Sequence, residues 1–212
     1  PLTIDAVELE RAGLWPDAAH ARRLADEFRV AKRAVLGTFA RHRTASAPRR
    51  VVAVTSALAG EGKSFASLHL AISFALERGL HVVLVDGDSA RPTLSRALGC
   101  AEAPGLLECL EGGASLDAAP RATSVPRLWF LPAGRTDLGA AELYSSPPMV
   151  QVLDHVLARF RDVVVVCDTP PLLLTVEARA LVDAALVGVA LGCSTDAIAD
   201  AVVASIRASG GT

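Results

Sequence analysis

The chain has 212 residues, 51% of them hydrophobic and 4% aromatic, and its 21 basic and 23 acidic residues give a net charge of −2. This length supports one sizeable core, and the nearly balanced charge excludes a strong field for nucleic acid or an anionic membrane, so we expect no nucleic-acid partner. The many Ala, Val and Leu residues suit an interior of parallel strands covered by helices.

The predicted elements begin with a mixed arm over residues 1–20 and an amphipathic helix over 21–39, where apolar side chains recur at three- and four-residue steps. The basic stretch 41–50 is typical of a solvated linker, with an acidic partner or a nucleotide contact as the alternative. Strands are then expected at 51–56, 81–88, 127–134, 162–171 and 185–192, and helices at 64–79, 146–160, 175–184 and 195–209. Gly79 is expected at the C′ position of its helix. This alternation indicates an α/β fold, a doubly wound, mainly parallel sheet that binds ligands at the carboxyl ends of its strands.

The beginning of the chain and its cysteines bear on the compartment. The first residues lack a signal-peptide profile, and no window supplies about 18 uninterrupted apolar residues. The cysteines stand far apart without a CxxC pair and fit reduced thiols; they are Cys100, Cys109, Cys167 and Cys193. We therefore expect a cytoplasmic protein, able to dock at the inner membrane through a protein partner.

The stretch TSALAGEGKS, residues 55–64, lies between a predicted strand and a predicted helix, as a phosphate-binding loop requires. Gly60 and Gly62 let backbone N–H groups converge on phosphate oxygens, Lys63 can reach the β and γ phosphates, and the Ser64 hydroxyl can ligate Mg²⁺. The alternative interpretation is a glycine-containing turn that binds nothing.

Ala57 stands where the usual pattern G-x-x-x-x-G-K-[ST] has its first glycine. Alanine still permits close approach, although a positive φ would strain it. The expected nucleotide contacts in the loop are Ala57, Leu58, Ala59, Gly60, Glu61, Gly62, Lys63, Ser64 and Phe65.

Three aspartates follow apolar strands. Asp86 and Asp88 alternate along one strand end and so are expected to point to different sides. Asp168 closes another strand, at the position of a Walker B carboxylate. A single such aspartate is commonly a cap, but three beside a phosphate loop favour a Mg²⁺–nucleotide site.

TSALAGEGKS, VVLVDGDSARP and VVVVCDTPP together resemble the Walker A, A′ and B motifs of bacterial tyrosine (BY) kinases, a P-loop NTPase-like family that commonly lacks the glycine at the position of Ala57. DSARP and PPLLLTVEARAL are most similar to autokinases encoded with exosortase-linked exopolysaccharide systems. The resemblance extends from about Leu24 to Ile206.

The resemblance implies an ATP-dependent protein-tyrosine autokinase that regulates exopolysaccharide synthesis or export, with ATP and Mg²⁺ as cofactors. The implied catalytic residues are Lys63, Asp86 and Asp88, and the implied metal ligands are Ser64, Asp86, Asp88 and Asp168. Which aspartate accepts the proton of the tyrosine hydroxyl stays open. Arg91 falls at a basic position of the family and either contacts the phosphates or forms a surface salt bridge.

The resemblance also implies partners. A membrane-embedded co-polymerase or chain-length protein would be the activator. Asp26, Arg29 and Lys32 form a degenerate E-x-x-R-x-x-R oligomerisation motif, and an ordinary solvated helix face fits them equally well. We expect a single domain with an arm and a candidate oligomerisation helix at 1–48, and a P-loop kinase part at 49–212 that is truncated at its C-terminus.

Two alternatives compete with a kinase. BY kinases typically end in a tyrosine-rich tail, whereas these residues hold one tyrosine, Tyr144, which fits packing better than the role of acceptor. An ATP-binding regulator of polysaccharide assembly with little phosphotransfer is therefore the first alternative. A Min/Par-type positioning ATPase is the second, although Leu58 replaces the signature lysine of those proteins.

Overall fold

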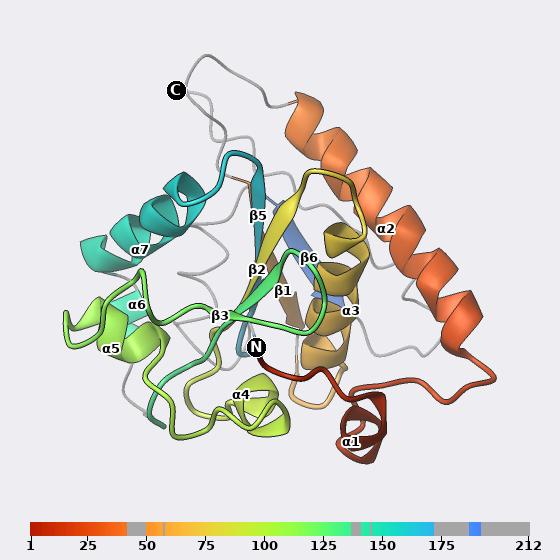
Figure 1. Cartoon of the computed structure of the whole chain (residues 1–212), viewed down its shortest axis with the longest axis horizontal. Coiled ribbons are helices and arrows are strands. Elements are labelled where there is room, and N and C mark those ends of the chain that lie inside the picture. Colours follow the sequence, from red (N-terminus) through yellow and green to blue (C-terminus); the bar gives the residue numbers. More distant parts are fainter. Residues whose placement is uncertain (42–49, 57, 137–140, 145, 172–186, 192–212) are drawn as a thin grey trace.

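The fold is a six-stranded sheet with helices on both faces, seen in a computed structural model of the chain (Figure 1). The structure describes residues 1–41, 50–56, 58–136, 141–144, 146–171 and 187–191. The strands are Val51–Ser56 (β1), His81–Asp86 (β2), Arg121–Ala122 (β3), Leu128–Leu131 (β4), Val163–Asp168 (β5) and Val187–Leu191 (β6). Their order is β3-β4-β2-β5-β1-β6, and every neighbouring pair is parallel except β3 with β4. The predicted α/β architecture is confirmed.

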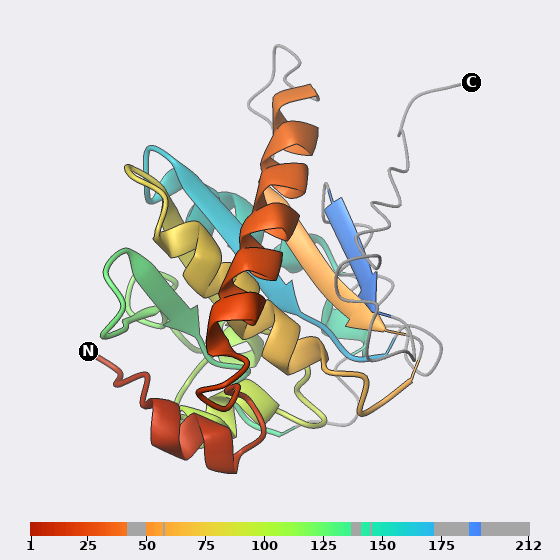
Figure 2. The same cartoon turned by 90° about the vertical axis from the view of Figure 1, so that its right-hand side faces the viewer.

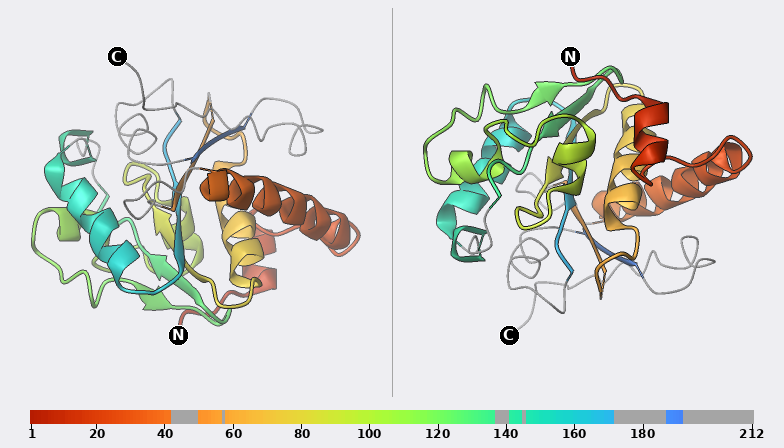
Figure 3. Two further views of the ribbon diagram at one scale, coloured as in Figure 1. Left: turned by 90° about the horizontal axis from the view of Figure 1, so that it is seen from above. Right: turned by 90° about the horizontal axis from the view of Figure 1, so that it is seen from below.

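The helices cover the sheet in two layers (Figures 1 and 3). The helices are Ala6–Arg11 (α1), Ala21–Arg41 (α2), Lys63–Ala75 (α3), Thr93–Ala97 (α4), Leu106–Leu110 (α5), Ala141–Tyr144 (α6) and Pro147–Ala158 (α7). Side chains of α1 to α4 pack on one face, and those of α5 to α7 pack on the other. Figure 2 shows α2 lying along the outside of α3. Because both faces are covered, β1 and β5 are buried at every residue, which explains their continuous β-branched runs.

Some details differ from the sequence-based expectation. Gly79 is not at the C′ position, because α3 already ends at Ala75; Gly79, with a φ of 77°, lies in the turn that leads into β2. The strand expected to reach residue 88 ends at Asp86. The short elements α4, α5, α6 and β3 were not expected. The predicted helices 175–184 and 195–209 lie outside the described residues, as do Cys193 and most of the basic stretch 41–50.

Gly105 permits a close contact between the start of α5 and the end of β4. A Cβ at this position would collide with backbone atoms of Pro132 and Gly134. We expect Gly105→Ala to lower the free energy of unfolding by about 2 kcal/mol or more, because backbone on both sides must shift. Gly37→Ala inside α2 is the control, expected to raise that free energy by roughly 0.5–1 kcal/mol. Urea unfolding measures both variants, and equal effects would contradict the close contact.

Candidate nucleotide site

The loop between β1 and α3 has the backbone that its glycines predict. Gly60 and Gly62 both have a φ of 84°, which L side chains rarely adopt, and Gly62 is the N-cap of α3. A Cβ would meet no atom within 4 Å at either glycine, so the dihedral angle is what demands glycine there. The α3 helix therefore presents its N-terminus, and the positive end of its dipole, at the loop.

Hydrogen bonds within the loop hold it together. The Leu58 backbone N–H donates to Glu61 Oε2 at 2.9 Å, and the Ser56 hydroxyl donates to the Leu58 carbonyl at 2.6 Å. Glu61 thus shapes the loop from within. Lys63 is 8% exposed and forms no ion pair with a carboxylate in the described part of the chain. Its charge remains available to an anion in the loop. Ala57 itself lies outside the described residues.

Two buried carboxylates meet beside the loop because β5 lies between β1 and β2. Asp86 and Asp168 are register partners at the ends of β2 and β5, and both are essentially fully buried. Burial raises the pKa of both carboxyls, the charge of Asp86 raises the pKa of Asp168 further, and the charge of Asp88 raises that of Asp86. The Ser67 hydroxyl donates to Asp168 Oδ1 at 3.2 Å, and the Ser64 side chain also hydrogen-bonds to Asp168. Within the described residues neither carboxylate is paired with a basic side chain, so the pair suits a bound cation.

Asp86 and Asp88 occupy different environments, as the sequence predicted, although Asp88 follows the strand instead of belonging to it. Asp86 Oδ2 accepts hydrogen bonds from the Ser95 backbone N–H and hydroxyl, both at 2.8 Å, and Oδ1 accepts one from the Asp88 N–H at 3.3 Å. Asp88 lines a pocket, and its Oδ1 accepts a hydrogen bond from the Arg91 N–H at 2.9 Å. Of the two, Asp88 is therefore the carboxylate that lines the pocket.

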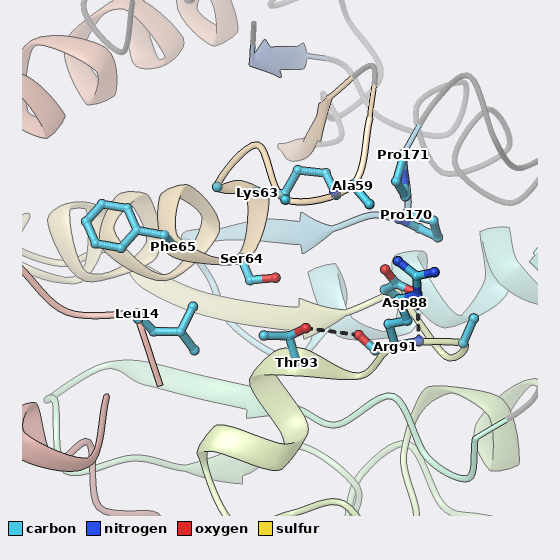
Figure 4. Close-up of a pocket in the computed structure, with 14 residues that line it drawn as sticks. Leu14, Ala59, Lys63, Ser64, Phe65, Asp88, Arg91, Thr93, Pro170 and Pro171 are labelled. Carbon is cyan, nitrogen blue, oxygen red and sulfur yellow. Dashed lines mark hydrogen bonds between the residues drawn. The ribbon is translucent and has the colours of Figure 1, made fainter. Parts of the chain in front are cut away.

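The pocket has a volume of about 510 Å³ and joins the loop, the aspartate turn and the N-terminal arm (Figure 4). It is lined by Gly13, Leu14, Ala59, Gly60, Gly62, Lys63, Ser64, Phe65, Asp88, Ala90, Arg91, Thr93, Pro170 and Pro171. Figure 4 shows Lys63 and Ser64 on one side of the pocket and Asp88 and Arg91 on another. Of the predicted contacts, Leu58 and Glu61 do not line the pocket.

A magnesium ion in this pocket would need ligands beyond the protein. No group of three or more His, Cys, Asp or Glu side chains could hold a metal by itself among the residues that the structure describes. Mg²⁺ commonly takes one or two protein ligands and completes its shell with phosphate oxygens and water. Ser64 beside Asp168 fits that pattern.

Sequence reasoning missed the part of the pocket that comes from the N-terminal arm. Leu14 is 4% exposed, and its carbonyl accepts a hydrogen bond from the His69 ring at 3.1 Å. The ring of His69 contacts those of Trp15 and Phe65, with centroids 5.0 and 4.4 Å apart. The arm is thus fastened to the first turns of α3. No spacing rule connects Leu14 with a loop some 45 positions away, and only the fold reveals the contact.

Docking of the arm makes stability depend on pH through His69. Burial lowers the pKa of His69 to about 4 from an ordinary 6.5, so the unfolded chain binds the proton more readily between these values. Stability is therefore full above pH 6.5 and is lost as the pH falls towards 4. We expect a loss of about 2 kcal/mol between pH 7.5 and pH 5. Urea unfolding at both pH values, with His69→Gln as comparison, measures it; an equal loss in that variant would contradict the assignment.

The charged motif on α2 is divided between surface and interior. Arg29 and Asp26 form an exposed pair at 2.8 Å, as expected of a solvated face. Lys32 is buried and pairs with Glu77 beyond the end of α3 at 2.8 Å. Lys32 therefore stabilises the fold of this chain.

No described helix has the length and apolar character needed to span a bilayer.

No family model matches the chain, but relatives and solved structures do. EpsB of Ralstonia solanacearum is 33% identical over 76% of this chain and 21% of its own length. Tyrosine-protein kinase YwqD of Bacillus subtilis is 35% identical over 61% of this chain and 54% of its own length. The succinoglycan biosynthesis transport protein ExoP of Rhizobium meliloti is 35% identical over 62% and 17%. The chain thus spans about half of YwqD and about a fifth of each of the other two.

Two solved structures share the fold. The BceF tyrosine kinase domain has a TM-score of 0.65 and 28% identity, over 84% of this chain and 70% of that one. The septum site-determining protein MinD from Pyrococcus horikoshii, complexed with Mg-ADP, has a TM-score of 0.53 and 25% identity, over 67% and 57%.

The glycine loop at the start of α3, beside carboxylates at the ends of neighbouring parallel strands, defines a P-loop NTPase-like protein. Agreement with tyrosine kinases in both sequence and fold makes the assignment narrower. Among P-loop NTPase-like proteins, the bacterial tyrosine kinases are similar to this chain in both sequence and fold.

Proposed function

We propose that this chain is the catalytic part of an ATP-dependent protein-tyrosine kinase in an exopolysaccharide system. The observation that carries the proposal is a pocket lined by Lys63, Ser64 and Asp88 (Figure 4). The buried pair Asp86 and Asp168 adjoins it, since Asp86 accepts a hydrogen bond from the Asp88 N–H. The names of YwqD, BceF and ExoP support kinase chemistry and the link to polysaccharide.

Phosphoryl transfer asks a protein mainly for positioning and for neutralisation of charge. The N–H groups at the start of α3 and the Lys63 ammonium would hold the phosphates of ATP. Mg²⁺, held by Ser64 and Asp168 together with phosphate oxygens, would neutralise charge that develops on them. Asp88 faces the pocket and is placed to accept the proton of an incoming hydroxyl, whereas Asp86 is buried beneath it. Its position in the pocket supports Asp88 as the proposed base. Arg91, in the same pocket, would contact phosphate oxygens.

The phosphate acceptor would lie outside these 212 residues. Their one tyrosine, Tyr144, is 2% exposed and packs with α7 on the far face of the sheet from α3. It cannot enter a pocket without unfolding α6. This observation also favours the second candidate, an ATP-binding assembly regulator with little phosphotransfer. In either case we propose a cytoplasmic location, self-association, and a membrane-embedded co-polymerase as the activator.

Phosphorylation of an added acceptor tests the proposal. Purified protein with Mg-ATP, γ-labelled, is incubated with a Glu–Tyr copolymer, and phosphotyrosine is identified by mass spectrometry. We expect label on tyrosine with wild type, and a loss of about 100-fold or more with Asp88→Asn. Nucleotide binding without phosphotyrosine would support the assembly regulator, and label unchanged by Asp88→Asn would contradict the role of Asp88.

A further inference from the structure

Ser95 on α4 connects the buried carboxylate of Asp86 to the rest of the fold. Its side chain is fully buried, and its hydroxyl donates to Asp86 Oδ2 at 2.8 Å. The same oxygen atom of Ser95 accepts a hydrogen bond from the Ala133 N–H at 3.0 Å. The hydroxyl is thus used as both donor and acceptor, and this fixes the direction of its proton towards the carboxylate.

The partner of Ser95 on the far side is itself rigidly held. Ala133 follows β4, and its carbonyl accepts the Leu107 N–H at 3.0 Å, while the Pro132 carbonyl accepts the Leu106 N–H at 2.8 Å. Both donors belong to the first turn of α5. The Ser95 hydroxyl therefore lies between Asp86 at the end of β2 and the loop after β4, and its two hydrogen bonds fix its orientation.

Asp86 links Ser95 to the turn that lines the pocket. Its Oδ1 accepts the Asp88 backbone N–H, so the carboxylate that Ser95 holds also anchors the turn that presents Asp88. Asp88 lines the pocket, whereas neither Ser95 nor Asp86 does. A series of contacts thus runs from the Ser95 hydroxyl through Asp86 to Asp88.

We propose that Ser95 is a positioning residue of the phosphoryl-transfer site, which acts through Asp86 on the placement of Asp88. This inference rests on the proposed kinase function. Loss of the hydroxyl would leave Asp86 with two backbone donors and free its carboxylate to rotate. The nucleotide loop would be untouched, because within the described residues the Ser95 N–H and hydroxyl form hydrogen bonds with Asp86 and Ala133 and not with residues 58–65.

Kinetics of serine variants test the inference with Mg-ATP and the Glu–Tyr copolymer. We expect Ser95→Ala to lower kcat about tenfold, the effect of losing one hydrogen bond to a charged group, with KM for ATP unchanged within about twofold. Ser95→Thr keeps the hydroxyl and is expected to retain most of the activity. Ser95→Cys is similar in volume to serine but donates weakly, and we expect it to lower kcat as Ser95→Ala does. It replaces the alanine variant in the test if that variant fails to fold.

Ser73→Ala is the matched control, because Ser73 is also a buried serine with a hydrogen-bonded hydroxyl, which donates to the Phe28 carbonyl at 3.3 Å, remote from the carboxylates. Equal kcat values for Ser73→Ala and Ser95→Ala, with an active wild type, would overturn the inference and leave the proposed function intact. A cysteine variant as active as the threonine variant would overturn it as well. A wild type that neither binds nor turns over Mg-ATP would overturn both.

Discussion

Replacement of Lys63 by alanine is expected to lower phosphoryl transfer from Mg-ATP by at least about 100-fold and to weaken ATP binding. Lys63 is the first residue of α3 and lines the pocket, and no described carboxylate forms an ion pair with it that would compete with the phosphates. Calorimetric titration with an ATP analogue and the copolymer assay measure the two effects.

The chain supplies a control for this change, because Lys32 is its other lysine. Lys32→Ala breaks the ion pair between the buried Lys32 and the half-exposed Glu77 and should lower the melting temperature, since the Glu77 carboxylate then loses the partner that lowers its pKa. ATP affinity should stay at the wild-type value, because α2 lies on the outer side of α3 (Figure 2). If Lys63→Ala bound ATP as tightly as Lys32→Ala, the loop would not be a nucleotide site.

Asp168→Asn is expected to abolish Mg²⁺-dependent phosphoryl transfer and, at the same time, to raise thermal stability in the absence of divalent cations. The wild-type fold holds Asp86 and Asp168 side by side in a buried position, and the loss of one charge removes their repulsion. Asparagine can still accept the hydrogen bond from Ser67. The free energy of unfolding is expected to rise by about 1–2 kcal/mol, so the variant would be more stable but inactive.

Thermal melts in EDTA and in excess Mg²⁺ with ADP measure this effect. Asp162→Asn is the control, because Asp162 is a half-exposed carboxylate near Arg50, and its loss should change stability by less than about 0.5 kcal/mol. A melting temperature that Asp168→Asn lowers in EDTA would contradict a strained carboxylate pair.

The central strands and the loop could be predicted because their causes are local. A continuous β-branched run is typical of a strand that is buried on both faces, so β1 and β5 could be predicted from their own residues. The positive φ angles of the loop require glycine, and the sequence has glycine at both positions. Tertiary contacts could not be predicted, because they join residues that are far apart in the sequence. Lys32 was placed on a helix face by spacing alone, which could not show that the turn after α3 would bring Glu77 beneath it.

Ser95 and Leu14 escaped for the same reason. Neither residue belongs to a recognisable sequence motif. Ser95 contacts Asp86 and the loop after β4, and Leu14 lines the pocket, only because the fold brings these segments together. The sequence likewise could not show that β2 ends at Asp86, so that Asp88 lies in a turn at the pocket and Asp86 does not line it.

The order β2-β5-β1 has a consequence for folding. The strand that carries Asp168 inserts between two strands that precede it by many residues, and the Ser67–Asp168 hydrogen bond joins positions 101 apart in the sequence. Such non-local contacts form slowly, since loop-closure entropy is lost before they stabilise the chain. The pocket therefore exists only once the centre of the sheet is complete. Recovery of ATP binding during refolding should lag behind recovery of helical circular dichroism, which makes the nucleotide a reporter of the last step of folding.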